Sequence, residues 1–299
     1  MNQTSIEWVL NPDGSPGFTW NPITGCLNHV NGMCKGGGFP CYAYKLANTR
    51  LRERYLAGGV VADEGTDHEN LLNPFYPRFW PEKLDQPLKR KKPAGIFTCD
   101  MSDLFGIGVP EQWTWSVLNF IKECPQHRFY LLTKQPQNLA KFSPFPDNCW
   151  VGVTATNYEM FNDAVWNLIN IEAKVEYLSL EPLLAPINAG ILDQYHNWPV
   201  MHGSILHNII DWIIIGAQTK PAKKPELQWV KDIIKAADTA GIPVFLKDSL
   251  YKLAMDRPVE DHDLYWEDMP TLRQELPVRG YGDQLVFNPE ARVTSGGGY

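Results

Sequence analysis

Short apolar segments with the composition of buried β-strands recur along the chain, and they constrain its fold more than any other feature. Between several of them lie segments with a helical spacing of apolar residues, such as 111–124 and 226–240. Near-continuous apolar strands that alternate with helices are typical of parallel βαβ units. We therefore expect an α/β fold, a partial or complete (β/α) TIM-like barrel, with a doubly wound open sheet as the alternative. The seven expected strands lie at 18–20, 95–98, 129–133, 150–154, 175–180, 212–216 and 244–246.

No linker divides the 299 residues, so we expect one barrel domain over 1–251 and a C-terminal extension over 252–299 that packs on it. Irregular stretches at about 60–94 and 186–210 are typical of insertions, and 42–58 predicts a helix. The apolar segments are too short to cross a membrane, and the first residues lack the basic and apolar segments of a secretory signal. We therefore expect a cytoplasmic protein that does not bind a membrane.

Three of the six cysteines, Cys26, Cys34 and Cys41, lie within sixteen residues in a segment rich in glycine and asparagine, which predicts a loop. A reducing compartment disfavours disulfides between them. Three thiolates on one loop can bind a metal centre, although three unrelated buried cysteines would also fit. A structural zinc site usually has four ligands in close pairs, whereas the gaps here are seven and six residues and His29 is poorly spaced as a fourth ligand. Three thiolates suit a [4Fe–4S] cluster with one iron left open.

Polar residues follow every expected strand, at the positions where the strands end. Because the carboxyl ends of parallel strands meet on one face, we expect these side chains on the same face as the three cysteines. Asp100, Ser102 and Asn157 could instead serve only as helix caps, whereas Lys134 and Glu181 are poor caps and better site candidates. The candidates are Cys99, Asp100, Ser102, Asp103, Lys134, Thr154, Asn157, Glu181 and Gln218.

The motifs that carry a family resemblance are distributed over nearly the whole chain. They lie at 6–8, 19–26, 41–43, 101–105, 131–134, 148–154, 178–184, 211–216 and 245–247. Together with three cysteines after the first strand, they resemble the S-adenosylmethionine (SAM) radical superfamily, and more closely a phage- and prokaryote-associated radical-SAM-like family. The chain resembles more distantly the spore photoproduct lyase branch, which acts on DNA. It departs from the superfamily in its longer cysteine gaps and in Pro40, which precedes the last cysteine in place of an aromatic residue; residues 35–38 resemble an insertion.

The resemblance implies a barrel of the radical SAM type with a [4Fe–4S] cluster on Cys26, Cys34 and Cys41 and with SAM on the fourth iron. An electron from a flavodoxin- or ferredoxin-type donor would cleave SAM to methionine and a 5′-deoxyadenosyl radical, which abstracts hydrogen from a substrate. Cys99 could donate hydrogen to a product radical, although a small residue at a strand end is its more ordinary interpretation. By the same resemblance, Asp100, Ser102 and Asp103 would bind the methionine amino group, Lys134 the carboxylate, Thr154 and Asn157 the ribose, and Glu181 and Gln218 the ribose, adenine or substrate.

Two other functions fit parts of the sequence. A non-catalytic zinc or iron–sulfur binding protein requires the strand-end polar residues to be only helix caps. A divalent-metal hydrolase or nuclease could use Asp100, Asp103 and Glu181, but it leaves the cysteines unexplained.

The sequence leaves the substrate open. The likeness to DNA-acting proteins and the many aromatic residues allow a nucleotide or a nucleic acid, and a peptide or a small metabolite is equally allowed. The net charge of −7 excludes a surface that is basic overall but allows a local basic cleft. The basic run at 89–92 is more typical of a solvated turn than of a phosphate-binding patch.

Overall fold

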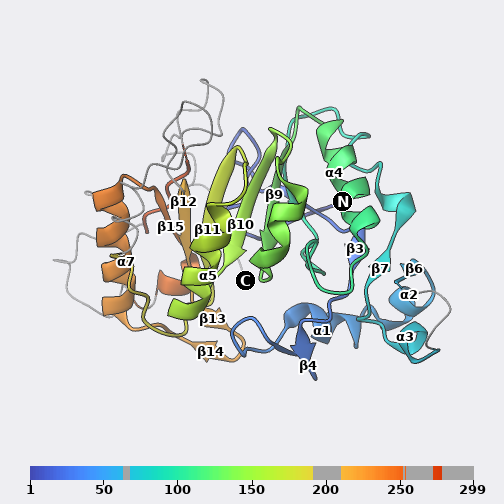
Figure 1. Ribbon diagram of the computed structural model, residues 1–299, viewed down its shortest axis with the longest axis horizontal. Coiled ribbons are helices and arrows are strands. Elements are labelled where there is room, and N and C mark those ends of the chain that lie inside the picture. Colours follow the sequence, from blue (N-terminus) through green and yellow to red (C-terminus); the bar gives the residue numbers. More distant parts are fainter. Residues whose placement is uncertain (63–67, 191–209, 252, 254–271, 278–299) are drawn as a thin grey trace, which may run out of the picture.

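The computed structural model describes residues 1–62, 68–190, 210–251, 253 and 272–277, and its centre is an eight-stranded sheet (Figure 1). Neighbouring strands from β2 to β15 pair in parallel, while β1 pairs with β2 in the antiparallel direction. The seven strands expected from the sequence are thereby confirmed to within one residue at each end. In spatial order the strands are β1 (Asn2–Gln3), β2 (Phe18–Trp20), β8 (Gly95–Thr98), β9 (Arg128–Thr133), β10 (Cys149–Thr154), β11 (Val175–Leu180), β12 (Trp212–Ile215) and β15 (Val244–Leu246).

The expectation of a partial or complete TIM-like barrel is wrong, because the described strands form an open sheet. One edge strand is β1, and β15 at the other edge is bordered by an antiparallel segment at 273–275. Leu246 N–H donates to Arg273 O (2.8 Å), and Glu275 N–H donates to Val244 O (3.0 Å). The first and last parallel strands therefore pair with antiparallel neighbours and not with each other. A doubly wound sheet is not matched either, since the parallel strands follow in sequence order without a reversal.

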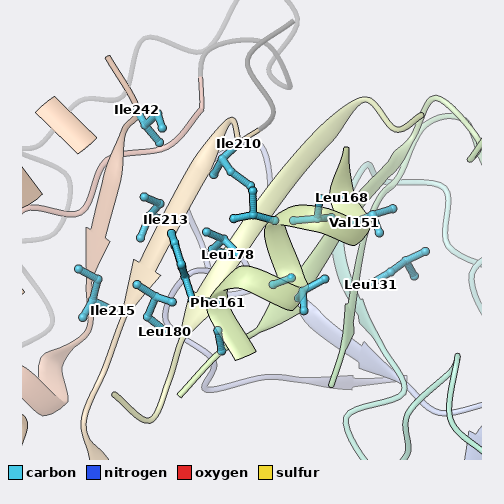
Figure 2. Packing of buried hydrophobic residues seen from close by; sticks show 14 of the residues in the cluster. Leu131, Val151, Phe161, Leu168, Leu178, Leu180, Ile210, Ile213, Ile215 and Ile242 are labelled. Atoms are coloured by element: carbon cyan, nitrogen blue, oxygen red, sulfur yellow. The ribbon is translucent and has the colours of Figure 1, made fainter. Parts of the chain in front are cut away.

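Helices cover one face of the sheet. They are α4 (Glu111–Lys122), α5 (Tyr158–Leu168) and α7 (Leu227–Ala240), and each contributes apolar side chains to one large buried cluster. Figure 2 shows Phe161 and Leu168 of α5 packed over Val151, Leu178 and Ile213 of the sheet. Burial on this face and on the opposite one explains why the strands are apolar throughout.

The opposite face curves around Trp8, which comes from the segment between β1 and β2. Its indole lies 5.4 Å from the ring of Phe97, 5.5 Å from Tyr130, 5.8 Å from Tyr177 and 5.9 Å from Trp212, measured between ring centroids. These four side chains belong to four different strands, β8, β9, β11 and β12. One side chain can contact all of them only if the sheet is strongly curved. The N-terminal segment thus forms the second layer of the core.

The helices expected at 111–124 and 226–240 are confirmed, and Gly241 ends α7 in the left-handed conformation of a C-cap. The single helix expected at 42–58 is wrong, because the segment forms α1 (Tyr42–Ala47) and α2 (Arg52–Leu56). The Asn48 side chain donates to Tyr44 O (2.9 Å), and the Thr49 hydroxyl donates to Lys45 O (2.6 Å). These side chains compete with the backbone for the last carbonyls of α1 and interrupt the helix.

Smaller elements surround the sheet. The expected insertion at 60–94 contains several of them, whereas most of the expected insertion at 186–210 and of the extension at 252–299 lies outside the described residues. In the described part of the chain, no helix has the length and apolarity that crossing a membrane requires. The smaller elements are β3 (Ile23–Thr24), β7 (Arg78–Phe79) and β6 (Val60–Val61) in one antiparallel sheet, the hairpins β4 (His29–Val30) with β5 (Met33–Cys34) and β13 (Gln218–Thr219) with β14 (Ala222–Lys223), the helix α3 (His68–Leu72), and the 3-10 helices η1 (Pro81–Lys83), η2 (Pro136–Phe142) and η3 (Asp248–Leu250).

Candidate metal centre

The three clustered cysteines lie on one loop that short elements hold in shape. Cys26 follows β3, Cys34 ends β5, and Cys41 is the N-cap residue of α1; all three are free thiols. Asn31 and Gly32 join β4 to β5 with φ angles of 48° and 82°, as a two-residue type I′ turn requires. Cys41 N–H donates to Gly32 O (2.8 Å), which holds the third cysteine against the hairpin.

Two of the three sulfurs accept a hydrogen bond from a nearby backbone N–H. Asn28 N–H donates to Cys26 (3.3 Å), and Tyr44 N–H at the start of α1 donates to Cys41 (3.5 Å). Such bonds stabilise the thiolate form, which is the form that binds a metal. The Gly36 N–H lies close enough to Cys34 to oppose the rise in the pKa of that thiol.

The three thiols are near enough to influence one another electrostatically. Burial, and after it the charge of Asp103, raises the pKa of Cys26 to about 12, and the other two thiols add to this rise. Burial also raises the pKa of Cys34, while the Lys134 ammonium opposes that rise. Without a metal the Cys26 and Cys34 thiols therefore keep their protons, and metal binding would release them.

Among the described residues, no group of three or more His, Cys, Asp or Glu side chains, the three cysteines of the loop included, is arranged to hold one metal ion.

The glycines at 36–38 let the cysteine loop pass closely over the ends of β9 and β10. A Cβ atom on Gly36 would lie 3.0 Å from Cβ of Lys134, and one on Gly37 would lie 2.5 Å from the Thr156 hydroxyl oxygen. Gly37 also has a φ of +113°, which L side chains rarely adopt. The stretch that resembles an insertion thus covers the strand ends. Close approach explains Gly36 and Gly37, whereas Gly38 has no atom within 4 Å of a Cβ position and a φ of +68°.

The turn after β8 lies directly beside the first cysteine. Gly25 N–H donates to Met101 O (3.0 Å), and the Ser102 hydroxyl donates to Gly25 O (2.6 Å). Asp100 accepts a hydrogen bond from the Asn21 side chain (2.5 Å), and burial raises the pKa of its carboxyl. Asp100 and Ser102 therefore lie next to the cysteine loop, as expected from the sequence.

Asp103 and Cys99 also lie at this turn, but both have partners within the fold. The Asp103 carboxylate accepts from the Thr133 hydroxyl (2.8 Å) and from the backbone N–H groups of Lys134 (3.0 Å) and Phe105 (3.1 Å). Cys99 is buried with a φ of +63°, and burial raises the pKa of its thiol. These two residues fix the bend that carries the chain from β8 towards the cysteines.

Thr154 and Asn157 follow β10 and differ in their hydrogen bonds. Asn157 is the N-cap residue of α5, and its side chain accepts from Met160 N–H (2.9 Å). The Thr154 side chain is buried, and its hydroxyl has no hydrogen-bond partner in the described structure. Buried polar groups are nearly always paired, so this hydroxyl is an exception, which it shares with that of Thr98 at the end of β8.

An ion cluster lies at the ends of β11 and β15. Glu181 accepts a hydrogen bond from the Lys247 ammonium (2.5 Å), and a carboxylate oxygen of Glu7 lies 3.8 Å from the same nitrogen. Gln218 instead donates to Pro221 O (2.7 Å) and closes the β13–β14 hairpin. Glu7 and Lys247 are not among the residues expected from the sequence, because nothing in their local sequence shows that the fold brings them together.

Comparison with known proteins places the chain in a family but assigns it no activity. A family model described as a protein of unknown function (DUF5131) matches residues 3–257. This match includes all the parallel strands and the whole cysteine loop. No curated protein and no solved structure matches the chain.

Proposed function

We propose that this chain, which belongs to the DUF5131 family of proteins of unknown function, is a SAM radical enzyme with a [4Fe–4S] cluster on Cys26, Cys34 and Cys41. The observation that carries the proposal is the set of three neighbouring sulfurs on one loop, two of which accept a hydrogen bond from a backbone N–H. Three protein ligands leave one iron open for SAM. When bound, the cluster would supply the electron that breaks a carbon–sulfur bond of SAM.

Lys134 is the residue best placed to bind the carboxylate of SAM. Its side chain packs on Gly36, and its ammonium lies 5.8 Å from the centre of the Phe39 ring and close enough to Cys34 to lower the pKa of that thiol. A cation at this position offsets the negative charge of the thiolates. It can also form a charge-assisted hydrogen bond with a carboxylate.

Asp100 and Ser102 are proposed to bind the amino group of SAM, and the unpaired Thr154 hydroxyl is proposed to bind its ribose. Asp103 is a positioning residue in this scheme, because its carboxylate holds the turn after β8 against the end of β9. The expected contacts of Asn157, Gln218, Glu181 and Cys99 with SAM or substrate stay predictions. The glycines at 36–38 would help to exclude water from the strand ends.

The proposed reaction needs an electron donor and a reducing compartment. A flavodoxin- or ferredoxin-type protein would supply the electron. All six cysteines are free, which fits the reducing cytoplasm.

The two other functions differ in how well the geometry supports them. A divalent-metal hydrolase is disfavoured, because Asp103 is engaged by Thr133 and backbone N–H groups and Glu181 is paired with Lys247. A non-catalytic zinc or iron–sulfur protein is the second candidate, because it would use the same three thiols. Metal analysis and SAM cleavage distinguish it from the enzyme.

The test is anaerobic purification, followed by iron and sulfide analysis and by incubation with SAM and dithionite. We expect a brown protein with about four irons per chain that releases methionine and 5′-deoxyadenosine. Cys34→Ala should lose both the iron and the activity. Cys149→Ala is the matched control, because Cys149 is a free thiol buried in the core outside the loop, and it should retain both. A colourless protein with one zinc, or an iron protein that leaves SAM intact, would contradict the proposal.

A further inference from the structure

Cationic side chains are concentrated in two segments of a chain that is acidic overall. Residues 26–59 contain five lysines and arginines and one glutamate, and residues 217–225 contain three lysines and no acidic residue. The whole chain has 27 cationic and 34 anionic side chains, so the residues outside these two segments have 19 cationic and 33 anionic side chains. Such a concentration of one sign of charge predicts an anionic partner.

The fold brings these two basic segments to the same edge of the sheet. The first contains the cysteine loop, α1 and α2, and it reaches the ends of β9 and β10 through Gly36 and Gly37. The second contains the β13–β14 hairpin, which begins three residues after the end of β12. Figure 1 shows α1 and this hairpin along the same lower edge. Because β11 lies between β10 and β12, the end of β11 lies between the two basic segments.

Seven of the eight cations of the two segments form no ion pair among the described residues. Exposed cations gain the most from a polyanion, because binding releases the counterions of its phosphates and costs no existing ion pair. Within the described residues, none of the following exposed side chains forms an ion pair: Lys35, Lys45, Arg50, Arg52, Arg54, Lys220 and Lys223.

Exposed apolar side chains accompany the cations of the first segment. Tyr42 at the start of α1 is 58% exposed, and Val30 and Met33 on the β4–β5 hairpin are 58% and 42% exposed. The Tyr42 hydroxyl donates to the carbonyl oxygen of Asp100, which holds the ring beside the proposed SAM site. Aromatic rings among cations are platforms on which the bases of a single strand stack.

We infer that single-stranded nucleic acid is the substrate of this site, with its phosphates bound by the two basic segments and a base presented between them. The inference rests on the proposed function for the reaction, but the binding itself follows from charge and exposure. A single strand is favoured over a duplex because a base must leave the stack to reach a reactive group.

The basic run at 89–92 does not belong to this surface. It directly precedes β8 and therefore lies at the amino ends of the strands, opposite the proposed site. Lys89 is paired with Asp85 (2.7 Å), and Lys92 is paired with Asp13 (3.0 Å). These two lysines provide a matched control for charge removal.

The test measures binding of a labelled single-stranded oligonucleotide to the iron-loaded protein by fluorescence anisotropy over a series of salt concentrations. The double variant Arg50→Gln, Arg52→Gln should weaken binding about tenfold or more at low salt. It should also make the plot of log K against log salt concentration less steep by about 1.4, because each phosphate that is no longer neutralised contributes about 0.7 to the slope. Lys220→Gln with Lys223→Gln should act in the same direction. Lys89→Gln with Lys92→Gln should leave binding unchanged.

Several outcomes would overturn the inference: no binding by the wild-type protein, tighter binding of the matching duplex, or equal weakening by the control pair. In another outcome, flavodoxin reduces the cluster of the Arg50→Gln, Arg52→Gln variant more slowly than that of the wild type, without competition from the oligonucleotide. That result would mean that the first segment binds an acidic protein instead. Iron content and 5′-deoxyadenosine release are measured on the same samples. Binding without a cluster overturns the proposed function, and with it the role of the strand as a substrate, but leaves the binding surface. SAM cleavage without binding overturns only this inference.

Discussion

Two buried threonines at the ends of adjacent strands should respond differently to loss of their hydroxyl groups. Thr133 donates to Asp103 (2.8 Å) and accepts from Gln135 N–H (2.9 Å), whereas the Thr154 hydroxyl has no partner in the described structure. Thr133→Val should lower the free energy of unfolding by about 1–3 kcal/mol, because it leaves buried groups unpaired. Thr154→Val should cost no stability but should raise the KM for SAM. Urea unfolding and SAM cleavage measure the two effects, and equal destabilisation by both variants would argue against a ligand role for Thr154.

A buried carboxyl should make stability depend on pH. Burial, and after it the charge of Asp211, raises the pKa of Glu176 well above its ordinary value of 4.5. The folded state therefore holds this proton more tightly than the unfolded state, so the stabilisation is complete below pH 4.5 and is lost as the pH rises through the folded pKa. Glu176→Gln replaces the ionisable carboxyl with a neutral amide and therefore removes this loss of stability at higher pH. Its free energy of unfolding relative to the wild type should increase between about pH 5 and pH 8, and a constant difference in urea unfolding would contradict the assignment.

The chemistry of single residues can be predicted from the sequence where the partners are close along the chain. Cys26, Cys34 and Cys41 lie on one loop, so their association is local and the candidate metal centre is visible before folding. Glu7 and Lys247 lie near opposite ends of the matched region, and only the fold brings them within 3.8 Å. The sequence shows which residues carry a carboxylate or an ammonium group, but it does not show which groups form hydrogen bonds with them.

The glycine segment of the cysteine loop provides a prediction for a whole element. Gly37 and Gly38 both have positive φ angles, but a Cβ atom would meet the Thr156 hydroxyl oxygen at 2.5 Å from Gly37 and nothing within 4 Å from Gly38. Gly38→Ala should lower the free energy of unfolding only by the strain of the left-handed conformation, about 1–2 kcal/mol. Gly37→Ala should also lift the loop from β10 and lower the iron content of the purified protein. Equal iron content in the two variants would show that the loop does not depend on this contact.

Elements can be predicted where burial repeats along them. All six residues of β10 are buried, and the resulting apolar run marks the strand in the sequence. The two-residue strands β6 and β7 are too short to have any period, and their pairing depends on residues far apart in the chain. The break between α1 and α2 depends on two side-chain hydrogen bonds that a helical spacing of apolar residues does not show.

At the scale of the whole molecule, the edges of the sheet decide whether it closes. The edge strand β15 is as apolar and buried as the inner strands, and β2 contains two aromatic residues, so the sequence predicts the strands without predicting which strands are neighbours. Closure would require β2 and β15 to pair with each other. In the described residues β2 pairs with β1 and β15 pairs with 273–275, and these antiparallel partners occupy the hydrogen-bonding edges that closure would use.

The segment at 273–275 should therefore stabilise the open sheet. Glu275 N–H donates to Val244 O (3.0 Å), and the Glu275 carboxylate accepts from Val244 N–H (2.7 Å). Glu275→Ala keeps the first bond but removes the second, together with the ion pair between Arg273 and the Glu275 carboxylate (3.0 Å). It should lower the free energy of unfolding by about 1–3 kcal/mol, since Val244 N–H then lies buried without this partner. Glu275→Pro also removes the N–H donor and should cost roughly 1 kcal/mol more. Urea unfolding of the two variants tests this order, and equal stabilities would mean that the segment does not pair with β15 in solution.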